Sequence, residues 1–382
     1  MVFTKLSPKP SVNAVFLGLQ GMENWFGTHI TGWYLKNKRD LPWRQEKDAY
    51  KIWLSEIILQ QTQVVQGLNY YLKFTQKYPT VKDLAMAPED EVLRLWQGLG
   101  YYSRARNLHA SAKLIHANFK GIFPSSYSQI KELKGVGDYT ASAIASFAYD
   151  LPHAVVDGNV YRVLSRVFGI KTPIDASKAK KEFQELADQL LDKKNPARYN
   201  QAIMEFGSQY CKPSNPDCES CVLNDKCYAF KHGLVAELPI KAKKVKIRKR
   251  HFNYLVPIDK KGNLVIHKRQ AGDIWQGLYE FTLIETDTAL TQQQLFKTKQ
   301  FKEGLKSTFT VKYTSVEYKH ILSHQHLYAK FYVLMISEVF KKSSIKTGSG
   351  SSILTNIDKL NDFAFPRLTG KFLDDCDLKE IV

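Results

Sequence analysis

The sequence lacks any run of about 20 consecutive apolar residues, the length that a membrane-spanning helix requires. It is also poor in acidic side chains: 37 aspartates and glutamates stand against 55 lysines and arginines, and the formal net charge is +18. This deficit favours polyanionic partners, with nucleic acid first and an anionic membrane surface second. A soluble protein that is basic for no functional reason is the plainer alternative. The chain has 382 residues, of which 44% are hydrophobic, so it can form two or three globular domains.

Cysteine is scarce as well, with five in the chain, and four of them lie within the 17 residues from Cys211 to Cys227. This crowding disfavours a disulfide framework and indicates a metal site in a reducing compartment. The spacing C-x6-C-x2-C-x5-C has one short pair between two wider steps. Structural zinc sites usually show two short pairs, so a [4Fe-4S] cluster fits the loop better. Zinc and four free thiols remain alternatives; the predicted ligands are Cys211, Cys218, Cys221 and Cys227.

Hydrophobic patterning divides the chain, in which no internal repeat is evident. Residues 1–21 hold an apolar run too weak for a signal peptide, which predicts a disordered leader. Residues 22–232 have apolar side chains at helical spacing and predict an all-α domain. Residues 233–249 are basic and lack an apolar face, which predicts an interdomain linker. Residues 250–382 hold short strand-like runs and predict a smaller α+β domain. The helical segments expected in the first domain are 51–74, 88–99, 103–119, 137–150, 158–170 and 178–192.

Two glycines one residue apart, Gly135 and Gly137, interrupt the apolar stretch LKGVGDYTA. The pattern predicts a helix, a tight turn and a second helix. The free amides and the dipole at the start of the second helix attract anions. Because glycine has no Cβ, a phosphate can approach the backbone on either side of Val136. The stretch therefore predicts a helix-hairpin-helix that grips the DNA backbone irrespective of sequence, with a simple glycine-rich turn as the alternative.

Two carboxylates have the surroundings that glycosidic bond cleavage needs. Asp157 in AVVDGNVYRV precedes a predicted helix, where it can act as an N-cap and be held ionised by the amides and the dipole. Glu56 stands on an apolar helical stretch beside Ser55 and several glutamines, which suggests that one helix face opens to a polar cleft. Desolvation there would raise its pKa and keep it protonated, whereas a surface glutamate is the plain alternative. One protonated and one ionised carboxyl would supply an acid and a charge stabiliser.

These motifs together carry a resemblance to a known family. The cysteine spacing, LKGVGDYTA and VVDGNVYRVLSR resemble the endonuclease III superfamily of base-excision DNA glycosylases. LPWR, SEIILQQTQV, GLGYYSRARNLH and NQAIMEFGSQYC resemble its adenine DNA glycosylases of the MutY type. The similarity runs from Trp25 to Tyr228, and a weaker one covers the C-terminal domain. It implies an all-α helix-hairpin-helix glycosylase domain with an iron–sulfur cluster loop, followed by an α+β Nudix-like lesion-recognition domain.

The resemblance implies a mechanism in which adenine paired with 8-oxoguanine or guanine is flipped out of double-stranded DNA. Glu56 would protonate adenine N7, and Asp157 would stabilise the oxocarbenium ion by its charge or through a transient covalent adduct. Tyr139 and Asn159 would orient this carboxylate and the attacking water. Superfamily members with lyase activity carry a lysine where Tyr139 stands, and a phenol cannot form a Schiff base. The expected enzyme is therefore monofunctional and leaves an abasic site.

Further positions match contacts to DNA in this family. Arg44 and Gln201 match residues that face the flipped adenine, and Gln61 and Tyr101 match residues that wedge into the duplex. Trp43 precedes Arg44 in LPWR and is assigned to the same surface. Ordinary core packing is the alternative for Trp43 and Tyr101.

The C-terminal domain carries a weaker form of the resemblance. KRQAGDIWQGLYEF resembles the Nudix turn and strand. Ser323 and His324 match a Phe-Ser-His signature and are assigned to contact with 8-oxoguanine, although Leu322 replaces the usual phenylalanine. TDTALTQQQLF lacks the glutamates of a metal-binding Nudix helix, so hydrolysis of nucleoside diphosphates is not expected.

Two other functions are compatible with parts of this pattern. A bifunctional glycosylase/lyase for oxidised pyrimidines is the first, and Tyr139 counts against it. A non-enzymatic iron–sulfur protein that binds DNA and senses damage or redox state is the second, and the presence of both Glu56 and Asp157 counts against it. The expected protein is a monomer without a membrane partner, cytoplasmic and nucleoid-associated if bacterial.

Overall fold

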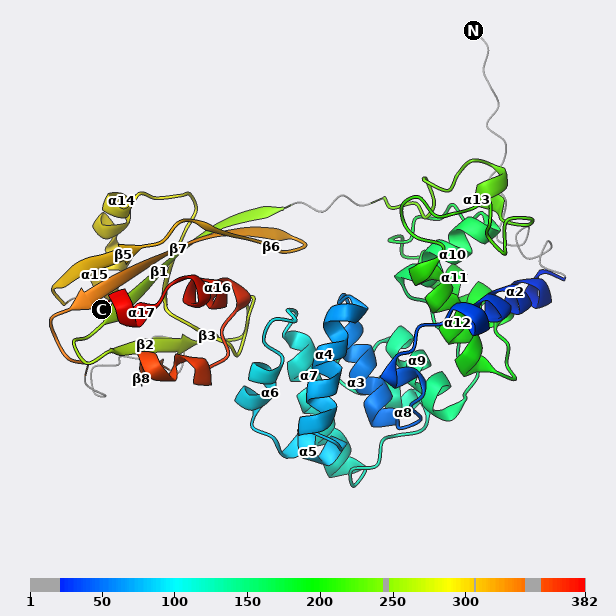
Figure 1. Ribbon diagram of the computed structural model, residues 1–382, viewed down its shortest axis with the longest axis horizontal. Coiled ribbons are helices and arrows are strands. Elements are labelled where there is room, and N and C mark those ends of the chain that lie inside the picture. The colour runs from blue at the N-terminus through cyan, green and yellow to red at the C-terminus, as the bar shows by residue number, and fades with distance from the viewer. Residues whose placement is uncertain (1–20, 243–246, 306, 341–351, 382) are drawn as a thin grey trace, which may run out of the picture. The chain divides into compact units, whose positions relative to one another are not determined.

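The computed structural model describes residues 21–242, 247–305, 307–340 and 352–381 (Figure 1). Contacts divide the chain into two compact units, one of residues 1–61 and 114–243 and the other of residues 62–113 and 244–382. The predicted leader, apart from Gly21, lies outside the described residues. None of the described helices is long and apolar enough to cross a membrane.

The described part of the first unit is built from helices, as predicted. Helix α12 (Pro196–Gln209) is central and contacts α2 (Met22–Asn37), α9 (Asp138–Tyr149) and α10 (Gly158–Phe168). Apolar residues at helical spacing explain α10, because Val160, Val163, Leu164 and Val167 are all buried. The remaining elements are the 3-10 helix η1 (Pro42–Arg44) and helices α3 (Ala49–Leu59), α8 (Tyr127–Lys131), α11 (Ala179–Leu190) and α13 (Tyr228–Lys231).

The segment expected as one helical run, residues 51–74, is interrupted. Helix α3 ends at Leu59 and α4 begins at Val64. Gln61, between them, has a φ of 53°, which is uncommon for a residue other than glycine. Four consecutive polar residues, 60–63, stand at the break, but Val64 follows Ile57 by about two helical turns, so the apolar pattern on the two sides predicts one helix.

The helix-turn-helix predicted around LKGVGDYTA is present as α8 and α9, which contact each other. The two glycines have different roles in the turn. Gly135 has a φ of 80°, a left-handed conformation that favours glycine. Gly137 has a φ of −92° and is the N-cap of α9, whose first amides have no side-chain cap. A Cβ at Gly137 would meet no atom within 4 Å, so the backbone there is open to an approaching group.

The second unit combines helices with a mixed sheet. The helices before residue 113 are α4 (Val64–Lys77), α5 (Val81–Met86), α6 (Glu89–Leu95) and α7 (Ser103–Asn118), the last of which continues into the first unit. The sheet has the order β3-β2-β1-β7-β5, with β4 paired to β1, β6 to β7 and β8 to β2. Strands β1 (Arg248–Ile258) and β7 (Gln325–Ile336) are parallel, and the other pairs are antiparallel. The remaining strands are β2 (Asn263–Lys268), β3 (Tyr279–Glu280), β4 (Thr282–Thr286), β5 (Phe309–Thr314), β6 (Tyr318–Ile321) and β8 (Ser352–Asn356).

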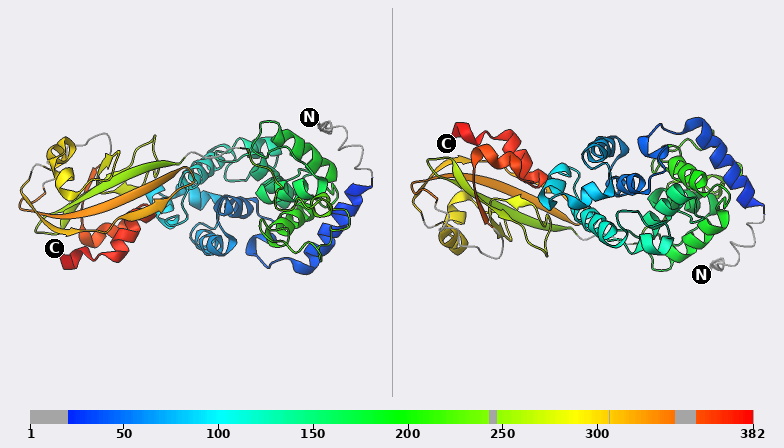
Figure 2. Two further views of the ribbon diagram at one scale, coloured as in Figure 1. Left: turned by 90° about the horizontal axis from the view of Figure 1, so that it is seen from above. Right: turned by 90° about the horizontal axis from the view of Figure 1, so that it is seen from below.

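Helices cover both faces of this sheet, as Figure 2 shows for red α16 (Arg367–Asp375) and yellow α14 (Gln292–Lys297). Alternate residues of β1 point to opposite faces. Tyr254 belongs to the core beneath α16, where Phe331 and Phe372 stack with ring centroids 4.0 Å apart. Its neighbour Leu255 belongs to the core with α14 and α15 (Lys299–Gly304). The 3-10 helix η3 (Ile357–Asp362) and α17 (Leu378–Ile381) complete the domain.

The segment expected as a linker, residues 233–249, is partly structured. Leu238 is buried, and its carbonyl accepts a hydrogen bond of 3.0 Å from Arg166 Nε of α10. At the other end, β1 already begins at Arg248. The basic segment has no apolar face, but it still packs against α10 at Leu238.

Candidate active site

Glu56 and Tyr139 form the centre of the candidate site. Helix α3 buries nearly all its side chains, and Glu56 is only 7% exposed. The Tyr139 hydroxyl, near the start of α9, donates a hydrogen bond of 2.7 Å to Glu56 Oε2. Burial raises the pKa of Glu56 to about 7, the hydrogen bond from Tyr139 opposes this rise, and the charge of Asp157 adds to it. A carboxyl with this pKa can hold and release a proton at neutral pH.

The polar cleft expected beside Glu56 does not include Ser55. This residue is 1% exposed, and its hydroxyl donates a hydrogen bond of 2.7 Å to the carbonyl of Ile52. A serine can satisfy its hydroxyl within its own helix, so polarity alone did not show which side chains face an opening.

Asp157 is both a helix cap and a partner of the site. Its Oδ1 accepts the amide of Val160 at 2.8 Å, and its Oδ2 accepts Asn159 Nδ2 at 2.9 Å. Burial raises the pKa of Asp157, and the donors of Val160 and Asn159 with the charge of Arg162 offset part of that rise. The hydrogen-bond donors predicted for Asp157 are present, but burial raises its pKa by more than these donors lower it.

Tyr139 connects the two carboxyls electrostatically. Burial raises its pKa well above 10.0, and the charges of Glu56 and Asp157 raise it further. The phenol therefore stays neutral and acts as a hydrogen-bond donor. Tyr139 contacts Glu56 directly, and the charge of Asp157 acts on both of these groups.

Arg162 and Gly207, which the sequence analysis did not select, contact Asn159 and fix its position. Arg162 Nη2 donates to Asn159 Oδ1 at 2.9 Å and to the Gly207 carbonyl at 2.6 Å. Its Nε donates to the Cys211 carbonyl at 2.8 Å. A Cβ on Gly207 would lie 2.8 Å from Asn159 Cβ and 3.1 Å from its carbonyl oxygen, so α12 and α10 touch there. Two features of the sequence could have indicated these residues. Arg162 is a charged residue on a helix whose apolar side is buried, and Gly207 is a glycine inside the helical stretch MEFGSQYC.

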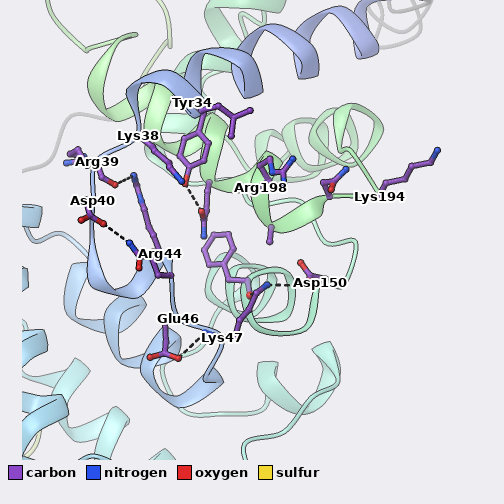
Figure 3. A pocket seen from close by; sticks show the side chains of 16 residues that line it. Tyr34, Lys38, Arg39, Asp40, Arg44, Glu46, Lys47, Asp150, Lys194 and Arg198 are labelled. Atoms are coloured by element: carbon purple, nitrogen blue, oxygen red, sulfur yellow. Dashed lines mark hydrogen bonds and ion pairs between the residues drawn. The ribbon is translucent and has the colours of Figure 1, made fainter.

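A second buried cluster surrounds Glu205, which is 1% exposed. Arg44 forms an ion pair with it, and Arg39 donates to its two carboxylate oxygens at 2.8 and 2.6 Å. Burial alone would raise the pKa of Glu205, but its hydrogen bonds with Arg39 and Arg44 lower it to about 2. Gln201, one helical turn earlier on α12, accepts a hydrogen bond of 2.7 Å from the Tyr34 hydroxyl (Figure 3). Sequence reasoning selected Arg44 and Gln201 but missed the carboxylate that fixes Arg44.

The residues assigned to DNA contact have contrasting exposures. Trp43 of η1 is buried, which agrees with the packing alternative, and Val136 is also buried, so the hairpin turn presents backbone there. Tyr101 is 48% exposed and has a φ of 48°, whereas Gln61 is exposed with a φ of 53°. Non-glycine residues in the left-handed region cluster at ligand clamps and switches. The two predicted wedge residues thus share an uncommon backbone conformation.

Ser323 and His324 lie exposed in the tight turn between β6 and β7, which the Leu322 amide closes by donating to the Gln325 carbonyl at 2.8 Å. Leu322 itself packs against the core of the sheet, so the leucine fills the place of the usual phenylalanine without opening the turn. Within the second unit, the hydroxyl oxygens of Ser323 and Tyr101 are 2.9 Å apart.

The four clustered cysteines line one small pocket together with Arg166, Phe206 and Tyr210. Arg166 Nη1 lies 3.4 Å from Cys211 Sγ and donates to the Lys212 carbonyl at 2.7 Å, which fixes the start of the loop. Among the residues that the structure describes, no three histidine, cysteine or acidic side chains converge on a point where a single metal ion could bind.

Comparison with known proteins places this geometry in a family. Residues 54–189 match the HhH-GPD superfamily of base excision DNA repair proteins, and residues 253–375 match the NUDIX domain. The adenine DNA glycosylase of Buchnera aphidicola subsp. Baizongia pistaciae is 33% identical over 346 residues, covering 90% of this chain and 94% of the relative. That of Rattus norvegicus is 42% identical over 226 residues, covering 56% of this chain and 44% of the relative.

Solved structures give the same fold for the first of these domains. A thermostable thymine-DNA glycosylase is 29% identical, with a TM-score of 0.53 over 56% of this chain and 98% of its own. A trapped endonuclease III–DNA covalent intermediate is 21% identical, with a TM-score of 0.50 over the same shares, and shows the fold alone. These matches confirm the predicted helix-hairpin-helix glycosylase fold and Nudix-like domain. Since the chain is 33% identical to the Buchnera relative over 94% of that protein's length, it belongs to the adenine DNA glycosylase family of base excision repair.

Proposed function

We propose that this enzyme removes adenine opposite 8-oxoguanine, or opposite guanine, from double-stranded DNA and leaves an abasic site without cutting the strand. The observation that carries the proposal is the group formed by Glu56, Tyr139 and Asp157. Enzymes assign an acid and a stabilising charge to two carboxyls by giving them different surroundings. Here Glu56 accepts a hydrogen bond from a phenol and has a pKa of about 7. Asp157 instead accepts hydrogen bonds from a backbone N–H and a side-chain N–H.

In this mechanism Glu56 gives its proton to N7 of the extruded adenine, which makes the base a better leaving group. Asp157 faces the positive charge that develops on the sugar, and it is held in place by the Val160 amide and by Asn159. The glycosidic bond breaks with its electron pair on the base, and water then adds to the sugar and releases a proton to the solvent. Charge stabilisation in a site where solvent is excluded is stronger than in water, which suits two carboxyls that are both largely buried.

Tyr139 supports the monofunctional part of the proposal. Strand cleavage by this superfamily requires an amine that forms a Schiff base with the sugar. Tyr139 stands at the predicted amine position, its hydroxyl is committed to Glu56, and a phenol has no imine chemistry. The water-adding route is therefore the one that these side chains can follow.

The cysteine pocket supports a [4Fe-4S] cluster held by Cys211, Cys218, Cys221 and Cys227. A single zinc ion needs all four sulfurs about 2.3 Å from one point. A cubane instead takes one thiolate on each of four irons, so its ligands stand further apart around one object. The four cysteines line one pocket together, and their spacing, with one short pair between two wider steps, favours the cubane over zinc. When bound, the cluster would supply a rigid anchor for the loop, which the Cys211 carbonyl connects to Arg162 and Asn159.

Recognition of the opposite base is assigned to Ser323 and His324, which are exposed in a turn held by two strands. Gln61 and Tyr101 are proposed to enter the duplex, and Arg44 and Gln201 to face the extruded base. The enzyme is proposed to act as a monomer in a reducing, cytoplasmic compartment.

Single-turnover cleavage of duplexes with adenine opposite 8-oxoguanine, followed by treatment with base, tests this function. We expect strand breaks only after base treatment, none with Asp157→Asn, and no covalent complex when borohydride is added. A complex trapped by borohydride would indicate a lyase, and an intact duplex would indicate a DNA-binding sensor. A duplex with thymine opposite guanine tests for the activity that names the structural relative. Iron and sulfide analysis of anaerobically purified protein, compared with zinc content, tests the cluster.

A further inference from the structure

The loop between β2 and β3 has an unusual backbone. Gly272, Trp275 and Gly277 have φ values of 103°, 62° and 84°. Glycine tolerates this left-handed region, but a bulky side chain such as that of tryptophan rarely adopts it. A residue in this conformation persists only where its surroundings hold it, and such residues cluster at functional sites. The contacts on either side of Trp275 therefore indicate what the loop holds in place.

The ring of Trp275 packs against the strand that leads into the turn between β6 and β7, which we call the lesion turn (residues 322–325). The centroid of this ring lies 5.7 Å from that of His320 on β6 and 6.3 Å from that of Phe252 on β1. The Arg269 guanidinium lies 5.8 Å from the centre of the same ring. Because β6 ends where the lesion turn begins, the ring of Trp275 supports the base of that turn.

The next residue of the loop, Gln276, joins it to α7. Arg106 Nη1 donates a hydrogen bond of 2.5 Å to the Gln276 carbonyl, and Arg106 Nη2 donates one of 3.2 Å to Gln276 Oε1. The loop also lies close to α6, because a Cβ on Gly277 would stand 3.2 Å from Leu93 Cδ1. Two adjacent residues, Trp275 and Gln276, therefore connect helix α7 to strand β6.

Helix α7 and the lesion turn meet at a second point. Tyr101, the proposed wedge, stands just before α7, and its hydroxyl oxygen lies 2.9 Å from that of Ser323 in the lesion turn. Both connections lie within the second unit. An exposed turn is the kind of segment that opens locally at little cost in free energy. Support at two points keeps this turn at a fixed distance from the wedge.

We propose that Trp275 and Arg106 are positioning residues, which hold the lesion turn against Tyr101 and so determine the preference for 8-oxoguanine over guanine opposite adenine. This inference rests on the proposed function, in which Ser323 contacts the opposite base. A binding group must be held within about 0.5 Å of its productive position by neighbours that are themselves fixed by packing. The Trp275 ring and the Arg106 hydrogen bonds supply that support for Ser323.

Single-turnover excision by the full-length enzyme, with adenine opposite 8-oxoguanine and opposite guanine, tests the effect on specificity. Trp275→Ala and Arg106→Lys should each lower the ratio of the two rates by about tenfold, because small misplacements of a contact are costly. Lysine keeps the charge of Arg106 but lacks its planar fork. Trp275→Phe keeps a ring and should retain most of the ratio. A merely structural role would lower both rates together and leave their ratio unchanged.

Each variant has a matched control. Phe296→Ala also removes a half-buried aromatic ring, but Phe296 packs in the core with α14, on the sheet face opposite Trp275. Arg94→Lys makes the same exchange as Arg106→Lys on the neighbouring helix α6, where Arg94 pairs with Asp362 at 3.8 Å. Both controls should keep the wild-type ratio. Controls that lower the ratio as much as the Trp275 and Arg106 variants would overturn the proposal.

Hydrogen exchange of the protein without DNA measures the positioning directly. The Leu322 amide closes the lesion turn by donating to the Gln325 carbonyl at 2.8 Å. Peptides that cover residues 318–328 should exchange about tenfold faster in Trp275→Ala and in Arg106→Lys, because local opening of the turn becomes easier. The two control variants should exchange at the wild-type rate.

The two measurements separate this inference from the proposed function. Unchanged exchange, or faster exchange with an unchanged ratio of rates, would overturn the positioning role of Trp275 and Arg106. If Ser323→Ala leaves the ratio unchanged, the assignment of lesion recognition to Ser323 is wrong instead. The exchange rates then still support or refute the support of the turn, because they depend on neither DNA nor excision.

Discussion

Replacing Gly207 with alanine tests how the site is positioned, because the change adds one methyl group where two helices meet. The new Cβ would stand 2.8 Å from Asn159 Cβ and 3.2 Å from its carbonyl carbon. Contacts this short force α12 and the start of α10 apart, since one of the opposing atoms belongs to the backbone. The residues that must move are Asn159 and, through its hydrogen bond, Asp157.

Two opposing energies set the stability of this variant. Alanine is better than glycine in a helix interior by about 1 kcal/mol. Overpacking of a tight contact costs about 1–3 kcal/mol. The net loss is therefore about 0–2 kcal/mol, which is small enough for the protein to stay folded. Catalysis is more sensitive, because a misplacement of about 1 Å in a reacting group costs up to about 100-fold in rate.

We therefore expect Gly207→Ala to slow the single-turnover rate of adenine excision at least tenfold, with an unchanged affinity for the duplex. Gly32→Ala is the control, because Gly32 lies inside α2 and a Cβ there meets no atom within 4 Å. The control should keep the wild-type rate and gain slightly in stability. A Gly207→Ala enzyme with the wild-type excision rate would refute the argument that contact between α10 and α12 positions Asn159.

Three further predictions follow from the charges of the two units. Excision should slow as the pH rises above about 7, where Glu56 loses its proton. In the wild-type enzyme the hydrogen bond from Tyr139 lowers the pKa of Glu56, so Tyr139→Phe should move this limb of the pH–rate profile to higher pH. A move to lower pH would contradict this. Glu205→Gln should cost about 3 kcal/mol in urea unfolding at pH 7, because it leaves two arginines without their carboxylate. Since the pKa of Glu205 falls from 4.5 to about 2, the wild-type advantage should fade as the pH falls through that range; an advantage unchanged at pH 2 would contradict the assignment. Arg250→Met should destabilise the C-terminal domain by about 1–3 kcal/mol, because a side chain 6% exposed loses ion pairs with Asp273 and Glu285. Unfolding monitored by the aromatic near-ultraviolet signal checks this, and an unchanged midpoint would show that the pairs are compensated.

Hydrophobic spacing and turn residues were sufficient for α3, α9, α10 and α11 and for the glycine hairpin, whereas α2 and α12 were not among the expected helical segments. These signals are local, since a helix start or a left-handed glycine depends on few neighbouring residues. The break at Gln61 was missed because the apolar residues before and after the polar stretch 60–63 are separated by about two helical turns, as they would be in one helix. The boundary near 233–249 differed because burial of Leu238 depends on α10, which is distant in sequence.

The proposed catalytic residues were easier to find than the residues that support them. Glu56, Tyr139 and Asp157 stand in motifs whose chemistry is visible in the sequence. Arg162 and Glu205 act through partners on other helices, so their importance depends on tertiary contacts. Burial also acts on Asp157 in a way that its N-cap position could not show, because it raises the pKa that the cap donors lower.

The hydrogen bond from Tyr139 also decides which oxygen of Glu56 can act. Because the phenol stays neutral and donates to Oε2, that oxygen is an acceptor, and the acidic proton is best placed on Oε1. In the proposed mechanism Oε1 is therefore the atom that meets N7 of the base. Tyr139→Phe frees Oε2 to carry the proton, so this variant should lose rate even below pH 6, where Glu56 stays protonated in both enzymes. Equal rates at low pH would show that the phenol adjusts only the pKa and does not orient the proton.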